Sequence, residues 1–213
     1  MNQDTDLTVE ETKHTNHVHR DDLASKMGMW LFLLTELLLF GGMFLLYASY
    51  RFQYPNDFKA AAAEMNTFIG AINTIILLTS SLTIALSIAA LQKKQKKLSV
   101  ILLSFTLLCG LMFLVNKYFE WTHEISNGIY PRGPALDNMS PGEAMYFGLY
   151  YTMTGLHGLH VIVGMIFIAI VLSFVIKDKL TFDNYTRLEN AGLYWHLVDI
   201  IWIFLFPLFY LIH

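Results

Sequence analysis

The sequence predicts an all-α integral membrane protein, a bundle of five transmembrane helices with a cytoplasmic N-terminus and a periplasmic C-terminus. Of its 213 residues, 55% are hydrophobic and only 15% are charged, and the mean hydropathy is +0.46. A soluble domain is typically about one quarter charged, so the apolar excess indicates a bilayer as the surrounding solvent. The net charge of −3 argues against a polyanion-binding protein, and no nucleic-acid partner is expected.

Five apolar segments are long enough to cross a membrane, because a hydrocarbon core of about 30 Å needs about 20 helical residues. The predicted spans are residues 27–50, 68–91, 98–121, 144–176 and 191–212. Together they form one membrane domain, residues 27–213, after a polar cytoplasmic tail, residues 1–26. No cleavable signal peptide is expected, since no apolar stretch precedes Trp30.

The segments between the spans have the composition of short surface connections. The first helix should end at Tyr54, because the residue before a proline avoids the helical region. Residues 92–97 form a tight basic turn, and residues 126–143 form the longest loop. Within that loop, Ser140 to Glu143 has the pattern of a capping box with proline in the first turn, which predicts a helix start.

The distribution of lysine and arginine predicts the orientation. Ten lie on the side of the N-terminus: Lys13, Arg20, Lys26, Lys93, Lys94, Lys96, Lys97, Lys177, Lys179 and Arg187. Only four are assigned to the other side: Arg51, Lys59, Lys117 and Arg132. Because cytoplasmic loops carry an excess of these residues, ten against four places the N-terminus in the cytoplasm and His213 outside.

Six ionisable residues within or near the spans form the candidate polar centre. They are Glu36, Glu120, His157, His160, His196 and Asp199. Such residues are costly in a bilayer, so they are expected to face the protein interior and to have partners. One hypothesis is a proton-active or cofactor-binding centre. The alternative, which we favour on the residues alone, is that carboxyl and imidazole groups bridge helices by hydrogen bonds.

The spacing of these residues allows them to meet at one level of the bundle. His157 and His160 share a helix face, as do His196 and Asp199, and Glu36 lies at a depth similar to that of Asp199. A haem held by His160 and His196 is a further alternative. The glycines beside His157 and His160 argue against it, because glycine favours close helix approach over a large cavity.

Three other features receive structural interpretations. His14, His17 and His19 resemble a metal-binding tract, but a solvated, disordered tail is the favoured interpretation. Cys109 is alone, so it is expected to be a small buried hydrophobe and not part of a disulfide. Several aromatic residues near helix ends are interpreted as interfacial belts: Trp30, Tyr47, Tyr50, Trp121 and Tyr146.

Four helix-embedded motifs carry a resemblance to a known family. They are residues 26–36 with 40–44 (KMGMWLFLLTE and FGGMF), residues 118–124 (YFEWTHE), residues 154–164 (TGLHGLHVIVG) and residues 194–205 (YWHLVDIIWIFL). In this order and on these helices, they resemble subunit III of haem-copper terminal oxidases. The resemblance covers residues 20–212, and the absence of two leading helices matches the short bacterial five-helix form.

The resemblance implies a non-catalytic role in the bacterial inner (plasma) membrane. Such a subunit packs on oxidase subunit I beside subunit II and other oxidase subunits, and a respiratory supercomplex is compatible with it. It binds phospholipid in a cleft, stabilises subunit I and supports its proton uptake. Haem and copper lie in the partner subunits, and no catalytic, cofactor-binding or metal-binding residue is expected on this chain.

The complex that the resemblance implies is a cytochrome c oxidase, which reduces oxygen to water with proton pumping. Two alternatives stay within the superfamily, namely subunit III of a quinol oxidase and an accessory protein of a nitric oxide reductase. A free-standing transporter or haem-b protein is the alternative from another class.

The resemblance also gives roles to matching positions. Glu36 is expected to lie opposite a histidine of the fourth span, such as His160, and to pin the first helix across the lipid cleft. The tail, with its histidines and with Asp21 and Asp22, is expected to buffer protons near the uptake entrance.

Overall fold

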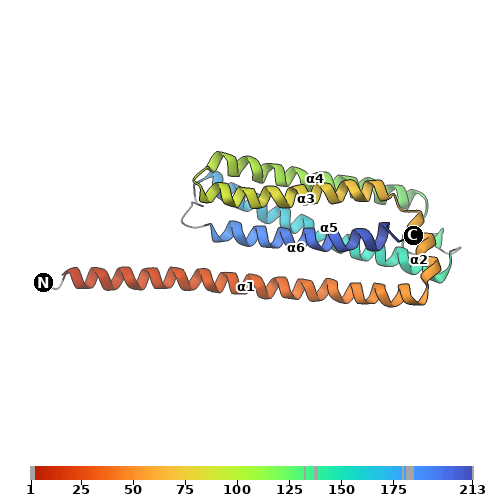
Figure 1. Cartoon of the computed structure of the whole chain (residues 1–213), viewed down its shortest axis with the longest axis horizontal. Helices are drawn as coiled ribbons and strands as arrows, with labels where there is room; N and C mark the ends of the chain where they lie inside the picture. Colours follow the sequence, from red (N-terminus) through yellow and green to blue (C-terminus); the bar gives the residue numbers. More distant parts are fainter. Residues whose placement is uncertain (1–2, 132, 137–138, 179, 181–184, 213) are drawn as a thin grey trace. The chain divides into compact units, whose positions relative to one another are not determined.

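The structure is a computed structural model that describes residues 3–131, 133–136, 139–178, 180 and 185–212, with side chains from residue 24 onward. All secondary structure in the described ranges is helical. The helices are α1 (Gln3–Gln53), α2 (Pro55–Ala63), α3 (Thr67–Gln92), α4 (Lys96–Ser126), α5 (Pro141–Ile176) and α6 (Thr186–Tyr210) (Figure 1).

Five helices are long and apolar enough to cross a membrane, which confirms the predicted fold class. The spans are Ala24–Gln53, Thr67–Gln92, Lys96–Ser126, Pro141–Ile176 and Thr186–Tyr210. Each contains or closely overlaps a predicted span. The orientation of the termini stays a prediction.

The chain divides into two compact units, residues 1–38 and residues 39–213. In the first unit the backbone is helical from Gln3, where the sequence predicted a disordered tail. The reason is local: no proline or glycine precedes Gly28, so nothing interrupts a helix that continues into the apolar span. The side chains of His14, His17 and His19 lie outside the described residues.

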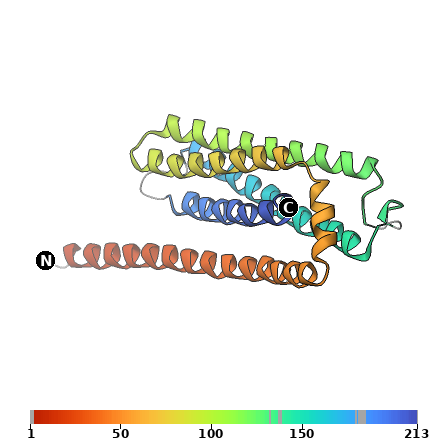
Figure 2. The ribbon, with the colours of Figure 1, turned by 45° about the vertical axis from the view of Figure 1, so that its right-hand side comes forward.

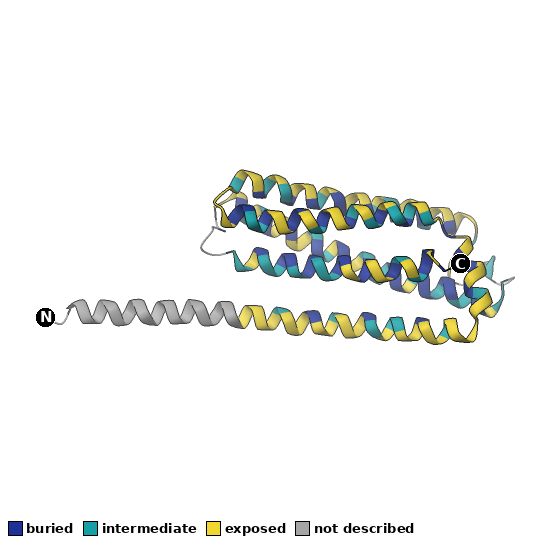
Figure 3. Cartoon of the chain, viewed as in Figure 1, coloured by how far each residue is buried: buried dark blue, intermediate teal, exposed yellow. Residues whose placement is uncertain are grey.

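In the second unit, α3, α4, α5 and α6 form a four-helix bundle. Each of these helices packs against two others: α3 against α4 and α6, and α5 against α4 and α6. The short helix α2 crosses the end of this bundle that holds the C-terminus (Figure 2). Buried residues line the faces that α3 to α6 turn toward one another, and exposed apolar residues cover the outside (Figure 3).

The indole of Trp195 occupies a slot between two glycines. A Cβ atom at Gly110 of α4 would lie 2.9 Å from Trp195 Cη2, and one at Gly164 of α5 would lie 2.9 Å from Trp195 Cε3. From this slot the indole Nε1 donates a hydrogen bond of 2.9 Å to Ser80 Oγ of α3. Small residues thus let α4, α5 and α6 approach closely, as is common between membrane helices.

The last turn of α6 is capped by side chains of three other helices. The hydroxyl of Tyr47 donates to the carbonyl of Leu208, and that of Tyr146 donates to the carbonyl of Phe209. Thr67 Oγ1 donates to the carbonyl of Tyr210 at 3.1 Å. These carbonyls have no partner within their own helix, and an unsatisfied group is costly in a membrane.

This capping corrects the interpretation of two of the aromatic residues near helix ends as part of interfacial belts. The side chains of Tyr47 and Tyr146 are fully buried, with 0% exposure, so they do not lie at a lipid surface. Their position near a helix end reflects the carbonyls that they cap. Cys109 is buried and unpaired, as predicted.

The connections are partly as predicted. Ser140 and Glu143 form the expected capping box at the start of α5. The helix α2 was not expected, because Pro55 was interpreted only as the end of the first helix. Proline is equally suited to the first turn of a helix, and the alanines that follow favour its continuation.

Candidate functional site

The most extensively bonded polar site is a buried ion pair near the end of the bundle that holds the C-terminus. Lys117 Nζ lies 3.1 Å from Glu120 Oε1, one helical turn away on α4. The two residues are only 7% and 6% exposed. A buried charge is stable only if it is paired and hydrogen-bonded, so the stability of this ion pair depends on the other partners of both groups.

Two tyrosines complete this site, which we call the Lys117 cluster: Lys117, Glu120, Tyr150 and Tyr210. The ammonium donates to the hydroxyl of Tyr150 at 3.1 Å and to that of Tyr210 at 2.8 Å. Both hydroxyls donate in turn to Glu120 Oε1. All three N–H groups of the lysine are therefore used, and the cluster joins α4, α5 and α6.

Lys117 also lies against the face of Trp202, with its Nζ 5.1 Å from the ring centroid. This contact adds a cation–π interaction to the ion pair. The second carboxylate oxygen of Glu120 has no hydrogen-bond partner among the described side chains.

The sequence interpretation assigned Glu120 to the polar centre but missed Lys117, which it counted only among the cations on the outer side of the membrane. The signal that was available is the spacing of three residues, which places both side chains on one face of a helix. Without Lys117, the lysine and arginine count becomes ten against three, so the predicted orientation is unchanged.

His157 is completely buried beside the Lys117 cluster. Its ring stacks on Trp202 with 5.3 Å between centroids, and the edge of Phe113 meets it at 5.6 Å. Neither ring nitrogen has a hydrogen-bond partner among the residues that the structure describes. Trp202 therefore contacts both a buried imidazole and a buried ammonium.

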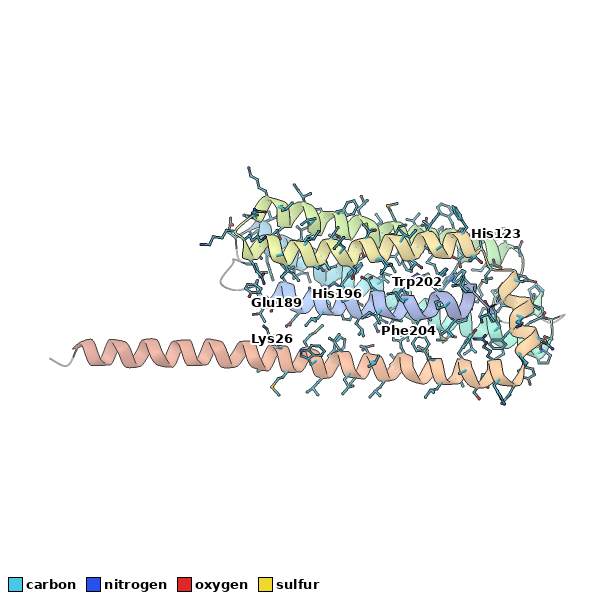
Figure 4. All side chains as sticks on the ribbon, viewed as in Figure 1. Lys26, His123, Glu189, His196, Trp202 and Phe204 are labelled. Atoms are coloured by element: carbon cyan, nitrogen blue, oxygen red, sulfur yellow. The ribbon has the colours of Figure 1, made fainter. Side chains whose placement is uncertain are left out.

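A second polar site lies nearer the start of α6. His196 Nδ1 lies 2.7 Å from Ser81 Oγ of α3. Asp199, one turn on, is only 2% exposed. His196 and Trp202 both belong to α6, where they flank Asp199 in sequence (Figure 4).

His160 has surroundings different from those of the other two histidines. Its Nδ1 lies 2.7 Å from the carbonyl of Leu156, and the ring of Phe40 packs edge-on at 5.2 Å between centroids. Glu36 belongs to the unit formed by residues 1–38, so its pairing with His160 stays a prediction.

Helix α3 supplies polar partners that the sequence interpretation missed. Asn73 accepts from Asn116 at 2.8 Å, and the hydroxyls of Thr83 and Thr106 lie 2.8 Å apart. Trp202 Nε1 donates to Thr74 Oγ1 at 3.0 Å. These short side chains carry no charge, so they do not stand out in a search for ionisable residues in a span.

The Lys117 cluster and the pairs Ser81–His196, Asn73–Asn116, Thr83–Thr106 and Thr74–Trp202 each link two or more helices. The six predicted residues divide among the Lys117 cluster, the Ser81–His196 pair and separate positions on α1, α5 and α6. Among the side chains described from residue 24 onward, no group of three or more His, Cys, Asp or Glu is placed to hold a metal ion.

Fold and site together define a multi-pass helical membrane protein whose interior polar groups join its helices. The family described as cytochrome c oxidase subunit III matches residues 2–213, so the chain belongs to that family. It is thus a subunit of a haem-copper oxidase complex and a multi-pass protein of the bacterial inner membrane, as the resemblance implied.

Bacterial relatives match over nearly the whole chain. One is called "Cytochrome c oxidase subunit 3" in Alkalihalophilus pseudofirmus; it is 32% identical over 92% of both chains. Another is called "Probable quinol oxidase subunit 3" in Staphylococcus saprophyticus; it is 30% identical over 96% of this chain and 94% of the relative. A protein of the same name in Staphylococcus haemolyticus is 30% identical over 100% of this chain.

Proposed function

We propose that this chain is the non-catalytic subunit III of an oxygen-reducing, proton-pumping oxidase, that it stabilises subunit I, and that it supports proton uptake by subunit I. The observation that carries the proposal is that interior polar groups join helices to one another. In the Lys117 cluster every N–H of the ammonium is bound to a group of α4, α5 or α6. Such a site holds a bundle in one arrangement, which suits a subunit that acts as a rigid support.

For the electron donor, we propose cytochrome c, and the name of the relative from Alkalihalophilus pseudofirmus supports it. Quinol is the second candidate, and the names of the staphylococcal relatives support it. This chain has no part in binding the donor under either proposal. The haem, the copper and the donor site belong to the partner subunits, with subunit I in direct contact and subunit II nearby.

The experiment that tests this function is purification of the tagged chain from its native membrane in a mild detergent. We expect subunits I and II to accompany it, and we expect the haem spectrum to belong to that complex. Oxygen consumption with reduced cytochrome c, compared with that on quinol, then identifies the donor. Co-purification with nitric oxide reductase subunits, or transport or a haem spectrum by the chain alone, would contradict the proposal.

Deletion of the chain separates support from catalysis. An oxidase assembled without it should keep its haem spectrum and its initial turnover rate but should lose activity faster during sustained turnover. A complex that lost its haem spectrum on deletion would show that this chain does more than support subunit I.

A further inference from the structure

The end of α4 presents an asparagine that is followed directly by a glycine. Asn127 and Gly128 are the only Asn–Gly pair in the sequence. In such a pair the backbone nitrogen of the glycine can attack the side-chain carbonyl carbon of the asparagine, because glycine has no side chain to obstruct the approach. The pair is therefore a candidate for spontaneous deamidation.

Deamidation needs no co-reactant except water. The Gly128 nitrogen bonds to Asn127 Cγ, and the proton of that nitrogen passes through water to the side-chain nitrogen, which leaves as ammonia. The product is a succinimide ring in the main chain. Water then adds to either carbonyl of the ring and opens it, which gives aspartate or isoaspartate. Nothing is oxidised or reduced in either step.

The amide of Asn127 is open to water and lies beside an imidazole. The residue is exposed, and its Nδ2 lies 3.5 Å from His123 Nε2, one turn earlier on α4 (Figure 4). Histidine is the side chain best suited to passing a proton near neutral pH. At this position it can supply a proton to the nitrogen that leaves as ammonia.

The cap of α4 holds the two reacting atoms apart. Asn127 is the C-cap residue with a ψ of 0°, and Gly128 follows with a φ of 80°. The Gly128 amide donates to the carbonyl of Ile125 at 3.0 Å. The Ile129 amide donates to that of Glu124 at 3.0 Å, which completes a Schellman motif. At this ψ the Gly128 nitrogen eclipses the backbone nitrogen of Asn127 and not its Cβ, so the ring cannot close until the motif opens.

A hydrogen bond from α5 helps to keep the motif closed. The hydroxyl of Tyr151 donates to the carbonyl of Ile129 at 2.6 Å, and Ile129 is only 7% exposed. The ring of Tyr151 packs against Trp121 of α4, with 5.4 Å between centroids. Because Ile129 donates the outer bond of the motif, opening the motif moves Ile129, and the bond from Tyr151 resists that movement. Helix α5 therefore influences how often the end of α4 opens.

We propose that Asn127 is a site of spontaneous deamidation in the folded protein and that the hydrogen bond from Tyr151 limits its rate. The product places a carboxylate at the C-terminal end of α4, where the helix dipole disfavours negative charge, and one turn from the buried Glu124. Isoaspartate also adds a methylene to the main chain, so the Schellman motif cannot re-form as before. The modification thus loosens the end of α4 as the protein ages. This inference goes beyond the proposed function and holds for either electron donor.

Peptide mapping tests the site. The protein, purified from its native membrane, is incubated for increasing times in a mildly alkaline buffer made with heavy-oxygen water. Conversion during the incubation then carries the heavy isotope, whereas conversion during later digestion does not. We expect aspartate and isoaspartate at position 127 to increase steadily. Asn66 is the internal reference: it is also exposed, but its side chain caps α3 and Thr67 follows it, so it should stay unconverted.

One variant and a matched control test the role of α5. Tyr151→Phe keeps the ring beside Trp121 but removes the bond to Ile129, and it should raise the conversion rate at Asn127 about threefold to tenfold, as expected for loss of one hydrogen bond. Tyr118→Phe is the control. It also removes a hydroxyl from the last part of α4, but its ring is 68% exposed and takes no part in the motif, so the rate should not change.

The denatured protein gives the rate without any cap, and conversion there should be faster than in either folded variant. Intact Asn127 in the folded protein and in Tyr151→Phe, over a time in which the denatured protein is converted, would overturn the site. Conversion of Asn66 as fast as that of Asn127 would overturn it as well. Equal rates at Asn127 with and without the Tyr151 hydroxyl would overturn the control by α5.

Discussion

At the scale of single residues, the feature with the greatest energetic consequence is the Lys117 cluster. Its ammonium and carboxylate are both nearly inaccessible, and each depends on the other and on two tyrosine hydroxyls. Removing one partner from a buried pair leaves a charge without compensation, whereas removing both does not. The ion pair between Lys96 and Asp178, at 2.6 Å, offers a natural comparison, because both of its side chains are exposed.

The first prediction concerns Lys117→Met. This change should reduce the free energy of unfolding by about 3–5 kcal/mol, because Glu120 would be left buried without a cation. The double change Lys117→Met with Glu120→Leu should recover most of that loss. The effect is measured by thermal unfolding of the purified complex, with release of this chain as the readout.

The control for this prediction is Lys96→Met, which should cost no more than about 1 kcal/mol, as for other exposed ion pairs. Equal costs for Lys96→Met and Lys117→Met would contradict the importance given to burial.

The second prediction concerns Glu36, whose partner the sequence predicts to be a histidine of α5 such as His160. If Glu36 pins the first span to the rest of the bundle, Glu36→Ala should loosen the subunit in the complex and shorten the turnover lifetime. The haem spectrum should stay unchanged, because no redox centre is expected near it. Retention of the chain during detergent washes and activity during prolonged turnover are the measurements; loss of haem from a fully assembled complex would refute the hypothesis.

The residue-scale features differ in how visible they are in the sequence. Glu120, His157 and Asp199 stand out because ionisable residues are rare within apolar spans. Lys117 does not stand out, since a lysine near the end of a span is normally expected to reach the interface. The partners on α3 could not be predicted, because serine, threonine and asparagine are common in membrane helices and only the helix packing shows which of them meet.

At the scale of helices, close approach depends on glycines whose partners lie on other helices. Trp195 of α6 fits between Gly110 of α4 and Gly164 of α5, so three helices meet at one indole ring. The sequence analysis expected close helix approach at the glycines beside His157 and His160, but the Cβ position of Gly158 is open, and the tight contact lies at Gly164, where the indole of α6 fills the space. Pairing between distant helices depends on how they rotate about their axes, which the apolar pattern of a span does not define.

The third prediction follows from this slot. Gly164→Ala and Gly110→Ala should each destabilise the chain by about 1–3 kcal/mol, because the added methyl group would overlap the indole of Trp195. Gly148→Ala should have little effect, since its Cβ position is open. Thermal unfolding monitored by tryptophan fluorescence compares the three variants, and equal stability of Gly164→Ala and Gly148→Ala would contradict the slot.

At the scale of the whole molecule, the number and order of the spans could be predicted, because the thickness of a bilayer sets the length of an apolar helix. The ends of the spans were predicted less accurately: α4 continues to Ser126, beyond the predicted residue 121. Polar residues such as Thr122 and Glu124 extend a helix once it has left the hydrocarbon. The orientation depends on charges in the loops and is the subject of the next prediction.

The fourth prediction is that the turn between α3 and α4 faces the cytoplasm and the end of α4 faces outside. Gln95→Cys should be protected from a membrane-impermeant thiol reagent in intact cells, whereas Ser126→Cys should be labelled. Both positions are exposed, and the native Cys109 is buried in a span, so background labelling should be low. The reverse labelling pattern would invert the topology derived from lysine and arginine.

The capped last turn of α6 has a consequence for biosynthesis. Tyr47, Tyr146 and Lys117 all find partners near the C-terminus, so helices made earlier hold polar groups whose hydrogen bonding the final segment completes. A ribosome must finish nearly the entire polypeptide before these groups are matched. We expect a chain truncated after residue 185 to insert but to be degraded rapidly in a pulse-chase experiment. Persistence as long as that of the full chain would show that completion by the last helix is not needed.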